Sequence, residues 1–326
     1  MTSLLKFKLM TSLLRTKFDS IENLILSGGG PILFTYAGLL NELETSDCGF
    51  KLENIKRIYG TSAGSIIGLF LCLGLPLKDL KEYLIGRPWE KVFEISPASI
   101  FNAYQLRGIL SKNVFHEMYR PVIESGDLGL TMDFTFTDLF NATGIHFSCF
   151  ATNIHEKELS KALIEFSHIK TPDEKVLNGI FYSSCLPILF QPEIIDETHC
   201  YTDGGIISGF PIDKFFENHP DVENEKILGI QKKAEPSSIE PLTKEDSIFK
   251  YVSHLLNFTK RCYYYHTDRD EETNERLKHI HHIIIKESMN IELIYNAIHS
   301  STIRQELVDL GHEVASKYLS KESIHS

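Results

Sequence analysis

The sequence predicts an α/β fold in which a central, mostly parallel sheet lies between helices and a helical C-terminal extension follows. Three observations support this prediction. Short apolar runs alternate with helical patterns from Ile21 onward. Two glycine-rich turns each join such a run to a helix, and after Lys233 a polar linker leads into further helical patterns. Strands separated by helices form parallel sheets, and the functional residues of such sheets gather at the carboxyl ends of the strands.

The predicted elements follow one another in chain order. Apolar runs predict buried strands at 23–27, 55–60, 145–153 and 227–230, the last of which we take as the final strand of the core. Helical patterns cover 36–44, 62–73 and 77–84, with a break at 88–90, a helical turn at 135–140 and a helix that restarts at 210–212. Residues 95–130 alternate short helical pieces with loops, which predicts a lid or rim over the site.

The two ends of the chain set the expected domain boundaries. Residues 235–246 form the polar linker, and residues 247–320 show helical patterns with one apolar run at 279–285. We expect one domain over 21–326, with a core at 21–232 and a helical extension at 233–326. Residues 1–20 are predicted to be a basic leader, since the first 18 residues hold four basic side chains and no acidic one. An amphipathic arm on an anionic membrane, a transit peptide and an unstructured segment all fit this leader.

Composition excludes two classes of protein. No run of about 18 or more apolar residues is present among the 326 residues, so the chain is not expected to be an integral membrane protein. The net charge of -11 argues against nucleic acid as a partner, because phosphate binding needs a concentrated basic face. The six cysteines are scattered and several stand in apolar contexts, which indicates buried thiols in a reducing compartment. We therefore expect a cytoplasmic location with peripheral membrane association.

The segment Gly60-Thr61-Ser62-Ala63-Gly64 has the G-x-S-x-G pattern of a nucleophile elbow. In an elbow the serine occupies a strained turn between strand and helix, and small neighbours let the two elements approach each other. The hydroxyl of Ser62 would project above a helix N-terminus, where peptide dipoles favour negative charge. Because glycine and serine are common, the motif by itself also fits a turn that serves packing alone.

Two further glycine turns flank the elbow in the sequence. Upstream, a short apolar run enters Gly28-Gly29-Gly30, whose backbone N–H groups are suited to hold an oxyanion because no Cβ obstructs a ligand. The same loop would suit a nucleotide phosphate, but it lacks the G-x-G-x-x-G spacing and the P-loop lysine. Downstream, Asp203-Gly204-Gly205 follows a predicted strand. An Asp-Gly hairpin turn is the structural alternative for this segment.

In this order, the three blocks resemble those of the patatin-like phospholipase family: a glycine-rich oxyanion loop, G-x-S-x-G and D-G-[GA]. The resemblance extends to the T-F-x-x-L-F segment at 135–140, the A-T-N strand end at 151–153, and the small-residue helix that ends at Pro187 before a strand pair near 191–192 and 201–203. It implies a three-layer α/β/α sandwich. It also implies a serine lipid acyl hydrolase of phospholipase A type, which cleaves fatty-acyl esters of lipids at a membrane surface without cofactor or metal.

The resemblance assigns roles to particular residues. Ser62 would be the nucleophile, and Asp203 its base without a histidine; a carboxylate does this only when it is partly desolvated and held close to the hydroxyl. Gly28, Gly29 and Gly30 would bind the oxyanion. Four further glycines would support the elbow and the aspartate turn: Gly60, Gly64, Gly204 and Gly205.

The sequence departs from the family pattern at one place, and three alternatives stay open. The family continues its loop as G-G-G-x-[RK]-G, whereas Pro31-Ile32-Leu33 follows Gly30 here, so the basic residue and the fourth glycine are missing. This departure motivates the alternative of a lipid-binding or membrane-docking protein with weak or no turnover. An acyltransferase of the same fold is a second alternative. A Ser-His-Asp hydrolase is the third, with a histidine from the set His199, His266, His279, His281, His282, His299 and His312.

Overall fold

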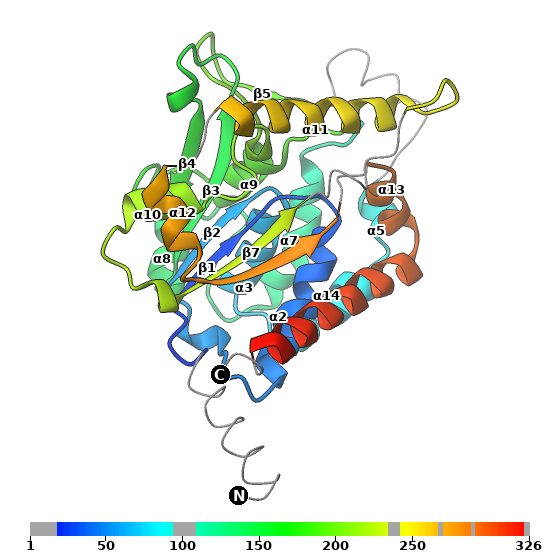
Figure 1. Cartoon of the computed structure of the whole chain (residues 1–326). Coiled ribbons are helices and arrows are strands. Elements are labelled where there is room, and N and C mark those ends of the chain that lie inside the picture. The colour runs from blue at the N-terminus through cyan, green and yellow to red at the C-terminus, as the bar shows by residue number, and fades with distance from the viewer. Residues whose placement is uncertain (1–17, 94–108, 234–241, 267–269, 288–290, 323–326) are drawn as a thin grey trace, which may run out of the picture.

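A mixed sheet lies at the centre of the molecule, as the computed structural model shows (Figure 1). The structure describes residues 18–93, 109–233, 242–266, 270–287 and 291–322, and within these ranges the sheet has eight strands. Its strand order is β5-β6-β3-β2-β1-β7-β8, with β4 paired to β3. The strands are β1 (Asn23–Leu26), β2 (Arg57–Thr61), β3 (His146–Asn153), β4 (Leu163–Ser167), β5 (Glu193–Ile194), β6 (Cys200–Asp203), β7 (Ile227–Lys233) and β8 (His281–Lys286).

The five neighbouring strands β3, β2, β1, β7 and β8 run parallel to one another. Strands β4 and β6 pair antiparallel with β3, and β5 pairs antiparallel with β6. The predicted α/β fold with a mostly parallel sheet is therefore confirmed. All four residues of β1 are buried, as expected of a central strand that is covered on both faces.

Helices connect the strands. Before β3 the helices are α2 (Ile32–Thr45), α3 (Ala63–Cys72), α4 (Leu77–Gly86), α5 (Trp89–Val92), α7 (Asn113–Ser125) and α8 (Phe136–Thr143). After β3 they are α9 (Val176–Ser184), α10 (Ile212–Asn218), α11 (Ile248–His266), α12 (Glu271–Leu277), α13 (Ile291–His299) and α14 (Ser301–Glu322). Short 3-10 turns stand at η1 (Leu52–Asn54), η2 (Leu159–Lys161), η3 (Gly204–Ile206) and η4 (Asn224–Lys226).

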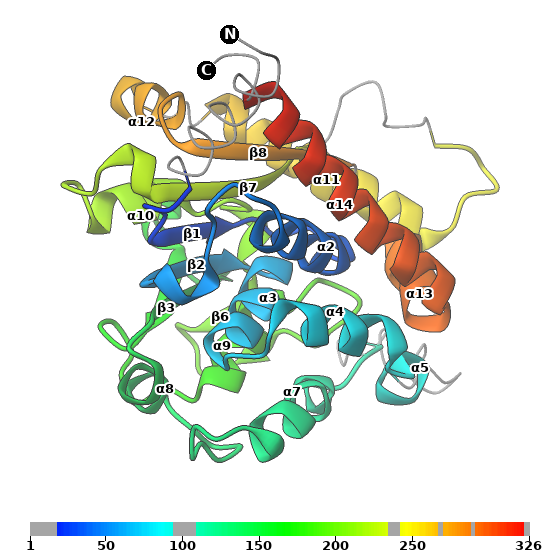
Figure 2. The same cartoon turned by 90° about the horizontal axis from the view of Figure 1, so that it is seen from below.

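Two hydrophobic clusters cover the two faces of the sheet. On one face, Leu24, Leu26 and Ile58 pack in a large cluster with residues of α2, α3, α9 and α14. On the other face, Ile25 and Tyr59 pack in a smaller cluster with residues of α10. In Figure 2 the helices α2, α3 and α14 lie on one side of the strands, and α10 and α12 lie on the other. The expected three layers are present, because alternate residues of each strand face opposite helical layers.

The C-terminal part contains a strand that the sequence analysis did not assign. We took β7 as the final strand of the core, but β8 pairs parallel to it, with Leu228 opposite His281. Burial alternates along β8, since His281, Ile283 and Ile285 are buried and Ile284 is exposed. The prediction of β7 as the last strand was therefore wrong. The long helix α14 packs on α2 and holds this region against the sheet.

Three local predictions need correction. The helix predicted from residue 36 begins at Ile32, because Pro31 suits a helix start. The short helix α5 begins at Trp89, inside the predicted break at 88–90, with Pro88 just before it. Within 95–130, residues 95–108 lie outside the described residues, and α7 is one continuous helix of 13 residues rather than short pieces, with Pro121 inside it. Its buried stripe, which includes Phe115 and Met118, provides the packing that offsets the proline.

The predicted leader and linker fall largely outside the described residues, namely at 1–17 and 234–241. Phe18, at the end of the predicted leader, is fully buried, with ring contacts to His281 and Tyr318. Among the described residues, no helix combines the length and the apolarity needed to cross a bilayer. The five cysteines whose side chains the structure describes are buried thiols, as expected.

Candidate active site

Ser62 occupies the junction between β2 and α3 in an unusual backbone conformation. Its φ of 52° and ψ of -120° lie in a region that residues with a Cβ rarely adopt. Hydrogen bonds hold it there: its N–H donates to Ser183 Oγ at 2.9 Å, and its carbonyl accepts from the N–H groups of Ser65 and Ile66 at 2.8 and 3.0 Å. The predicted elbow geometry is thus present, with the hydroxyl at the carboxyl end of a parallel strand.

The two elbow glycines permit a close approach of backbones. A Cβ on Gly60 would lie 2.5 Å from the carbonyl oxygen of Gly64. A Cβ on Gly64 would collide with the carbonyl of Leu26 in β1. Any larger residue at either position would push α3 away from the sheet, and the start of α3 beside Ser62 would move with it.

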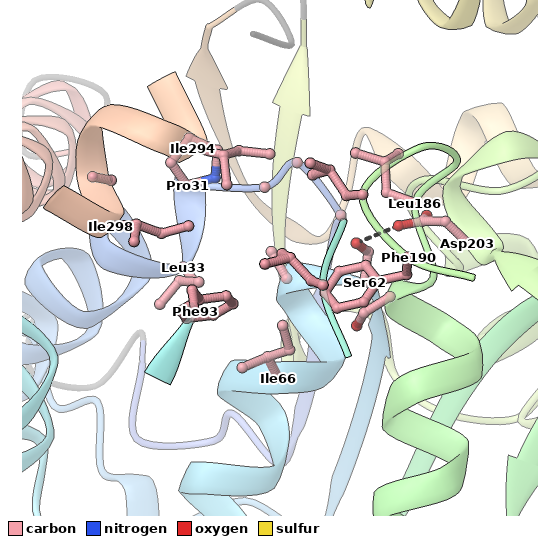
Figure 3. A pocket seen from close by; sticks show the side chains of 18 of the residues that line it. Pro31, Leu33, Ser62, Ile66, Phe93, Leu186, Phe190, Asp203, Ile294 and Ile298 are labelled. Atoms are coloured by element: carbon pink, nitrogen blue, oxygen red, sulfur yellow. Dashed lines mark hydrogen bonds between the residues drawn. The ribbon is translucent and has the colours of Figure 1, made fainter. Parts of the chain in front are cut away.

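Strand β3 brings Asp203 to Ser62 from 141 positions away in the sequence. Phe150 of β3 pairs with Thr61 at the end of β2, and the next residue, Ala151, pairs with Asp203 at the end of β6. Consecutive residues of one strand therefore hold the ends of the two strands that carry the candidate dyad. Ser62 Oγ donates a hydrogen bond of 2.6 Å to Asp203 Oδ2 (Figure 3).

The carboxylate of Asp203 is fixed in place by its surroundings. Its second oxygen, Oδ1, accepts from the N–H of Gly205 at 2.7 Å. The backbone of Asp203 is held as well, since its carbonyl accepts from Thr152 Oγ1 at 3.0 Å and its N–H donates to the carbonyl of Cys185 at 3.0 Å. Exposure is only 9% for Ser62 and 5% for Asp203, so the pair is largely withdrawn from water.

The glycine loop lies beside Ser62, but the N–H of its first glycine, Gly28, already makes a hydrogen bond within the protein. The N–H of Gly28 donates to the carbonyl of Gly209 at 2.8 Å, which corrects the expectation that all three loop amides face an oxyanion. The lack of a side chain at Gly28 instead lets the loop lie close to Ser62, because a Cβ on Gly28 would be only 3.0 Å from Ser62 Cβ. Within the described part of the chain, no acceptor is found for the N–H groups of Gly29 and Gly30.

A further candidate donor, which the sequence analysis did not name, is the N–H of Ala63. Ala63 is the first residue of α3, and its N–H has no acceptor among the described residues. The signal for it was present in the motif, because in a nucleophile elbow the residue after the serine supplies an oxyanion donor. The first amides of α3 also carry the positive end of the helix dipole toward Ser62.

An almost wholly apolar pocket opens over the dyad (Figure 3). Parts of the chain that are far apart in the sequence contribute to its walls, among them Ile66 of α3, Phe115 of α7, Leu186 and Phe190 after α9, and Ile294 and Ile298 of α13. The departure from the family loop contributes to this lining too. Pro31 and Leu33 face the pocket, whereas Ile32 is fully buried in the core. The pocket therefore offers mostly apolar walls around the hydroxyl of Ser62 and the carboxylate of Asp203.

The histidines proposed for a Ser-His-Asp arrangement, as far as their side chains are described, lie outside the pocket; the side chain of His266 is not among those described. None of the described residues that line the pocket is a histidine. His199 bonds Asp196, His282 bonds Gln231 and His312 bonds Glu42. The hydrogen bond of the Ser62 hydroxyl goes directly to a carboxylate. Among the residues that the structure describes, no group of three or more His, Cys, Asp or Glu side chains is arranged to hold a metal ion.

Comparisons with known proteins identify relatives in sequence and in fold. A family model described as patatin-like phospholipase matches residues 24–216, which is more than half of the chain. The chain is 26% identical over 212 residues to the uncharacterized protein R571 of Acanthamoeba polyphaga mimivirus, which covers 65% of each chain. It is 28% identical over 201 residues to the "Probable lipid hydrolase 463L" of Invertebrate iridescent virus 6, which covers 61% of this chain and 64% of that protein.

In both cases the chain spans slightly less than two thirds of the relative's length. Among solved structures, VipD from Legionella pneumophila matches with a TM-score of 0.50 and 18% identity. This match covers 93% of the chain and 67% of VipD, and it shows a shared fold.

Proposed function

The chain belongs to the patatin-like phospholipase family, a family of lipid hydrolases, and from this premise we propose that it cleaves fatty-acyl esters of membrane lipids with Ser62 as nucleophile and Asp203 as general base. The observation that carries the proposal is the hydrogen bond of 2.6 Å from Ser62 Oγ to Asp203 Oδ2, made by a serine in an elbow conformation. The isolated motif also fitted a packing turn, but a packing turn has no need of this bond.

In the acylation step, Ser62 Oγ attacks the ester carbonyl carbon while its proton passes to Asp203 Oδ2. The carbonyl oxygen becomes an oxyanion, for which the N–H groups of Gly29, Gly30 and Ala63 are the candidate donors. The tetrahedral intermediate collapses and the C–O bond to the lipid alcohol breaks. Asp203 returns the proton to that alcohol, which leaves. Ser62 then carries the acyl group as an ester.

In the deacylation step, a water molecule attacks the acyl ester and gives its proton to Asp203. The second tetrahedral intermediate releases the fatty acid, and the proton returns to Ser62 Oγ. The bond from Gly205 N–H to Asp203 Oδ1 keeps the other carboxylate oxygen aimed at the hydroxyl through both steps. This arrangement performs both proton transfers with a single carboxylate.

The lining of the pocket supports a fatty-acyl chain as the group that Ser62 receives. Side chains such as Ile66, Phe190 and Ile298 surround the dyad with apolar surface. Burial of each methylene group of a chain in such a pocket contributes about 0.8 kcal/mol. A fatty-acyl chain is therefore favoured over a polar acyl group. We propose phospholipid as the substrate class, at the surface of a membrane.

Substitution of either member of the dyad tests the proposal. We expect Ser62→Ala to abolish labelling by a fluorophosphonate probe. Ser62→Ala and Asp203→Asn should each lower the rate of fatty-acid release from phospholipid vesicles by roughly a thousandfold or more. Asp196→Asn is the matched control, because Asp196 is an exposed acid of the β5–β6 hairpin that bonds Thr198 and His199, and it should leave the rate unchanged.

Each contrary result points to a different conclusion. A folded wild-type protein that neither labels nor releases fatty acid contradicts hydrolysis and favours a lipid-binding protein. An Asp203→Asn variant with the wild-type rate shows that another group is the base. Transfer of the acyl group to an added alcohol in preference to water identifies an acyltransferase.

A further inference from the structure

A lysine from a distant part of the sequence lies against the glycine loop. Lys232, near the end of β7, donates from Nζ to the carbonyl oxygen of Gly29 at 3.2 Å. Its side chain lies so close to the loop that a Cβ on Gly29 would be 2.5 Å from Lys232 Cδ. The loop and the residues that follow it, through Leu33, carry no basic side chain of their own. Lys232 therefore brings a positive charge to the loop from another strand.

The neighbouring parts of the loop are anchored by other contacts. Ser27, just before the glycines, is tied to β7 and to α2: its Oγ accepts from the N–H of Lys232 in β7 at 2.7 Å, and its carbonyl accepts from Tyr36 Oη in α2 at 2.7 Å. The N–H of Gly28 donates to the carbonyl of Gly209 at 2.8 Å. The carbonyl of Gly29 comes next along the chain, and the ammonium group of Lys232 holds it. The anchoring of the loop thus continues up to the peptide that joins Gly29 to Gly30.

This anchor determines where the next N–H points. In a trans peptide the carbonyl and the following N–H point in opposite directions, and no cis peptide occurs in the described chain. The carbonyl of Gly29, fixed on Lys232, therefore sets the direction of the Gly30 N–H, which has no acceptor within the described residues. Glycine on both sides imposes little steric preference between two orientations of this peptide. A side-chain anchor is what selects one of them.

We propose that Lys232 is a positioning residue for the oxyanion site: by holding the Gly29 carbonyl it keeps the Gly30 N–H directed at the developing negative charge. This inference rests on the function proposed above. Preorganised donors stabilise the transition state without binding the ground-state ester more tightly. Loss of the anchor therefore lowers kcat and leaves KM nearly unchanged.

The competing explanation is that Lys232 has a purely structural role, in which its positive charge offsets the buried carboxyl group of Glu287. Burial raises the pKa of Glu287, and the positive charge of Lys232 acts against that rise, so the two groups interact through space. If Lys232 served only to compensate this buried carboxyl group, removal of the carboxylate charge would make Lys232 dispensable. The double variant Lys232→Met with Glu287→Gln separates the two roles.

The test compares four variants in the full chain with a soluble short-chain p-nitrophenyl ester, so that membrane binding does not enter. Lys232→Met should lower kcat and the rate of fluorophosphonate labelling by about 10- to 100-fold, with KM within about twofold of wild type. Lys232→Arg, which keeps a cationic donor, should recover most of the loss. Lys233→Met is the matched control: it removes the same charge from an exposed position one residue along β7 and should behave as wild type. The double variant should stay as slow as Lys232→Met.

Several results would overturn the inference. They are a wild-type kcat in Lys232→Met, a loss confined to KM, an equal loss in Lys233→Met, and recovery of the rate in the double variant. Should Lys232→Met fail to fold, Lys232→Gln is used with the same expected direction. Failure of the proposed function looks different, because wild type itself would then show no labelling or turnover that depends on Ser62.

Discussion

At the scale of single residues, one neighbouring hydroxyl helps to hold the strained backbone of Ser62. A non-glycine residue at a φ of 52° costs about 1–3 kcal/mol, so its surroundings must hold it in place. Ser183 does this from α9, because its Oγ accepts the N–H of Ser62 at 2.9 Å. Ser184, the next residue, is also buried, but its Oγ has no hydrogen-bond partner within the described part of the chain. Two adjacent serines of similar burial thus differ in hydrogen bonding: the hydroxyl of Ser183 accepts a hydrogen bond, and that of Ser184 has no partner among the described residues.

This contrast makes a prediction about stability. Ser183→Ala leaves the N–H of Ser62 buried and unpaired, so we expect the free energy of unfolding to fall by about 1–3 kcal/mol. Ser184→Ala removes a hydroxyl that has no partner, and we expect a change within about 0.5 kcal/mol. Urea denaturation of both variants measures the difference. Equal losses in the two variants would show that the bond to Ser62 contributes nothing to stability.

At the scale of elements, two glycines set the distance between α2 and α14. A Cβ on Gly38 of α2 would collide with the carbonyl of Val308, and a Cβ on Gly311 of α14 would collide with the carbonyl of Thr35. The two helices therefore touch backbone to backbone at two points. Because α2 follows the glycine loop, the position of α14 bears on the candidate site through α2.

We expect Gly311→Ala to destabilise the protein by about 1–3 kcal/mol, since the added methyl group forces the two helices apart. Gly86→Ala is the matched control: Gly86 ends α4, is exposed, and has no atom within 4 Å of the position of an added Cβ. That change should be neutral or slightly stabilising, because alanine favours helix over glycine. Thermal unfolding followed by circular dichroism measures both. A Gly311→Ala protein as stable as wild type would mean that the contact between α2 and α14 is looser than described.

At the scale of the whole molecule, a buried polar network joins elements that are far apart in the sequence. Tyr59 Oη lies 3.3 Å from His146 Nε2 and 3.1 Å from His219 Nε2. Glu165 accepts from Ser148 Oγ at 2.8 Å and from Asn218 Nδ2 at 2.9 Å. These contacts tie β2, β3, β4 and α10 together on the face of the sheet opposite the largest cluster. A change in the charge of this network therefore affects the stability of the entire fold.

The network predicts how stability depends on pH. Burial, with added repulsion from His168, His219 and Arg57, lowers the pKa of His146 to about 3. As pH falls below the ordinary histidine value of about 6.5, the unfolded chain binds a proton that the folded chain excludes. The free energy of unfolding should therefore fall as the medium is acidified, by up to about 1.4 kcal/mol per pH unit from this group.

Urea denaturation at pH 7, 6 and 5 measures this dependence. His146→Gln should show a shallower loss of stability over that range. His155→Gln removes an exposed histidine instead and should follow the wild-type slope. A wild-type stability that does not change from pH 7 to pH 5 would contradict the assignment of His146 as a neutral buried group.

Local pattern in the sequence was sufficient for most of the central fold. The apolar runs at 23–27, 55–60 and 145–153 became β1, β2 and β3 within two residues at either end, because such runs with glycine punctuation are typical of buried parallel strands. The three glycine-containing blocks identified the family correctly. The motifs predict Ser62 and Asp203 as the dyad, and the structure brings their side chains together. Their catalytic roles stay predictions that the substitutions above test.

By itself, the sequence determined the family, the order of the central strands and helices, and the two residues of the candidate dyad, since each rests on short motifs and apolar runs that are visible in the local sequence. Only the tertiary structure decided that β8 joins the sheet, that the N–H of Gly28 donates to the carbonyl of Gly209, and that Lys232 contacts the glycine loop. The reason is physical: these contacts join residues that lie tens to hundreds of positions apart. Whether a short run such as β8 becomes a strand depends on which hydrogen-bonding edge it meets after folding, and local pattern carries no information about that edge.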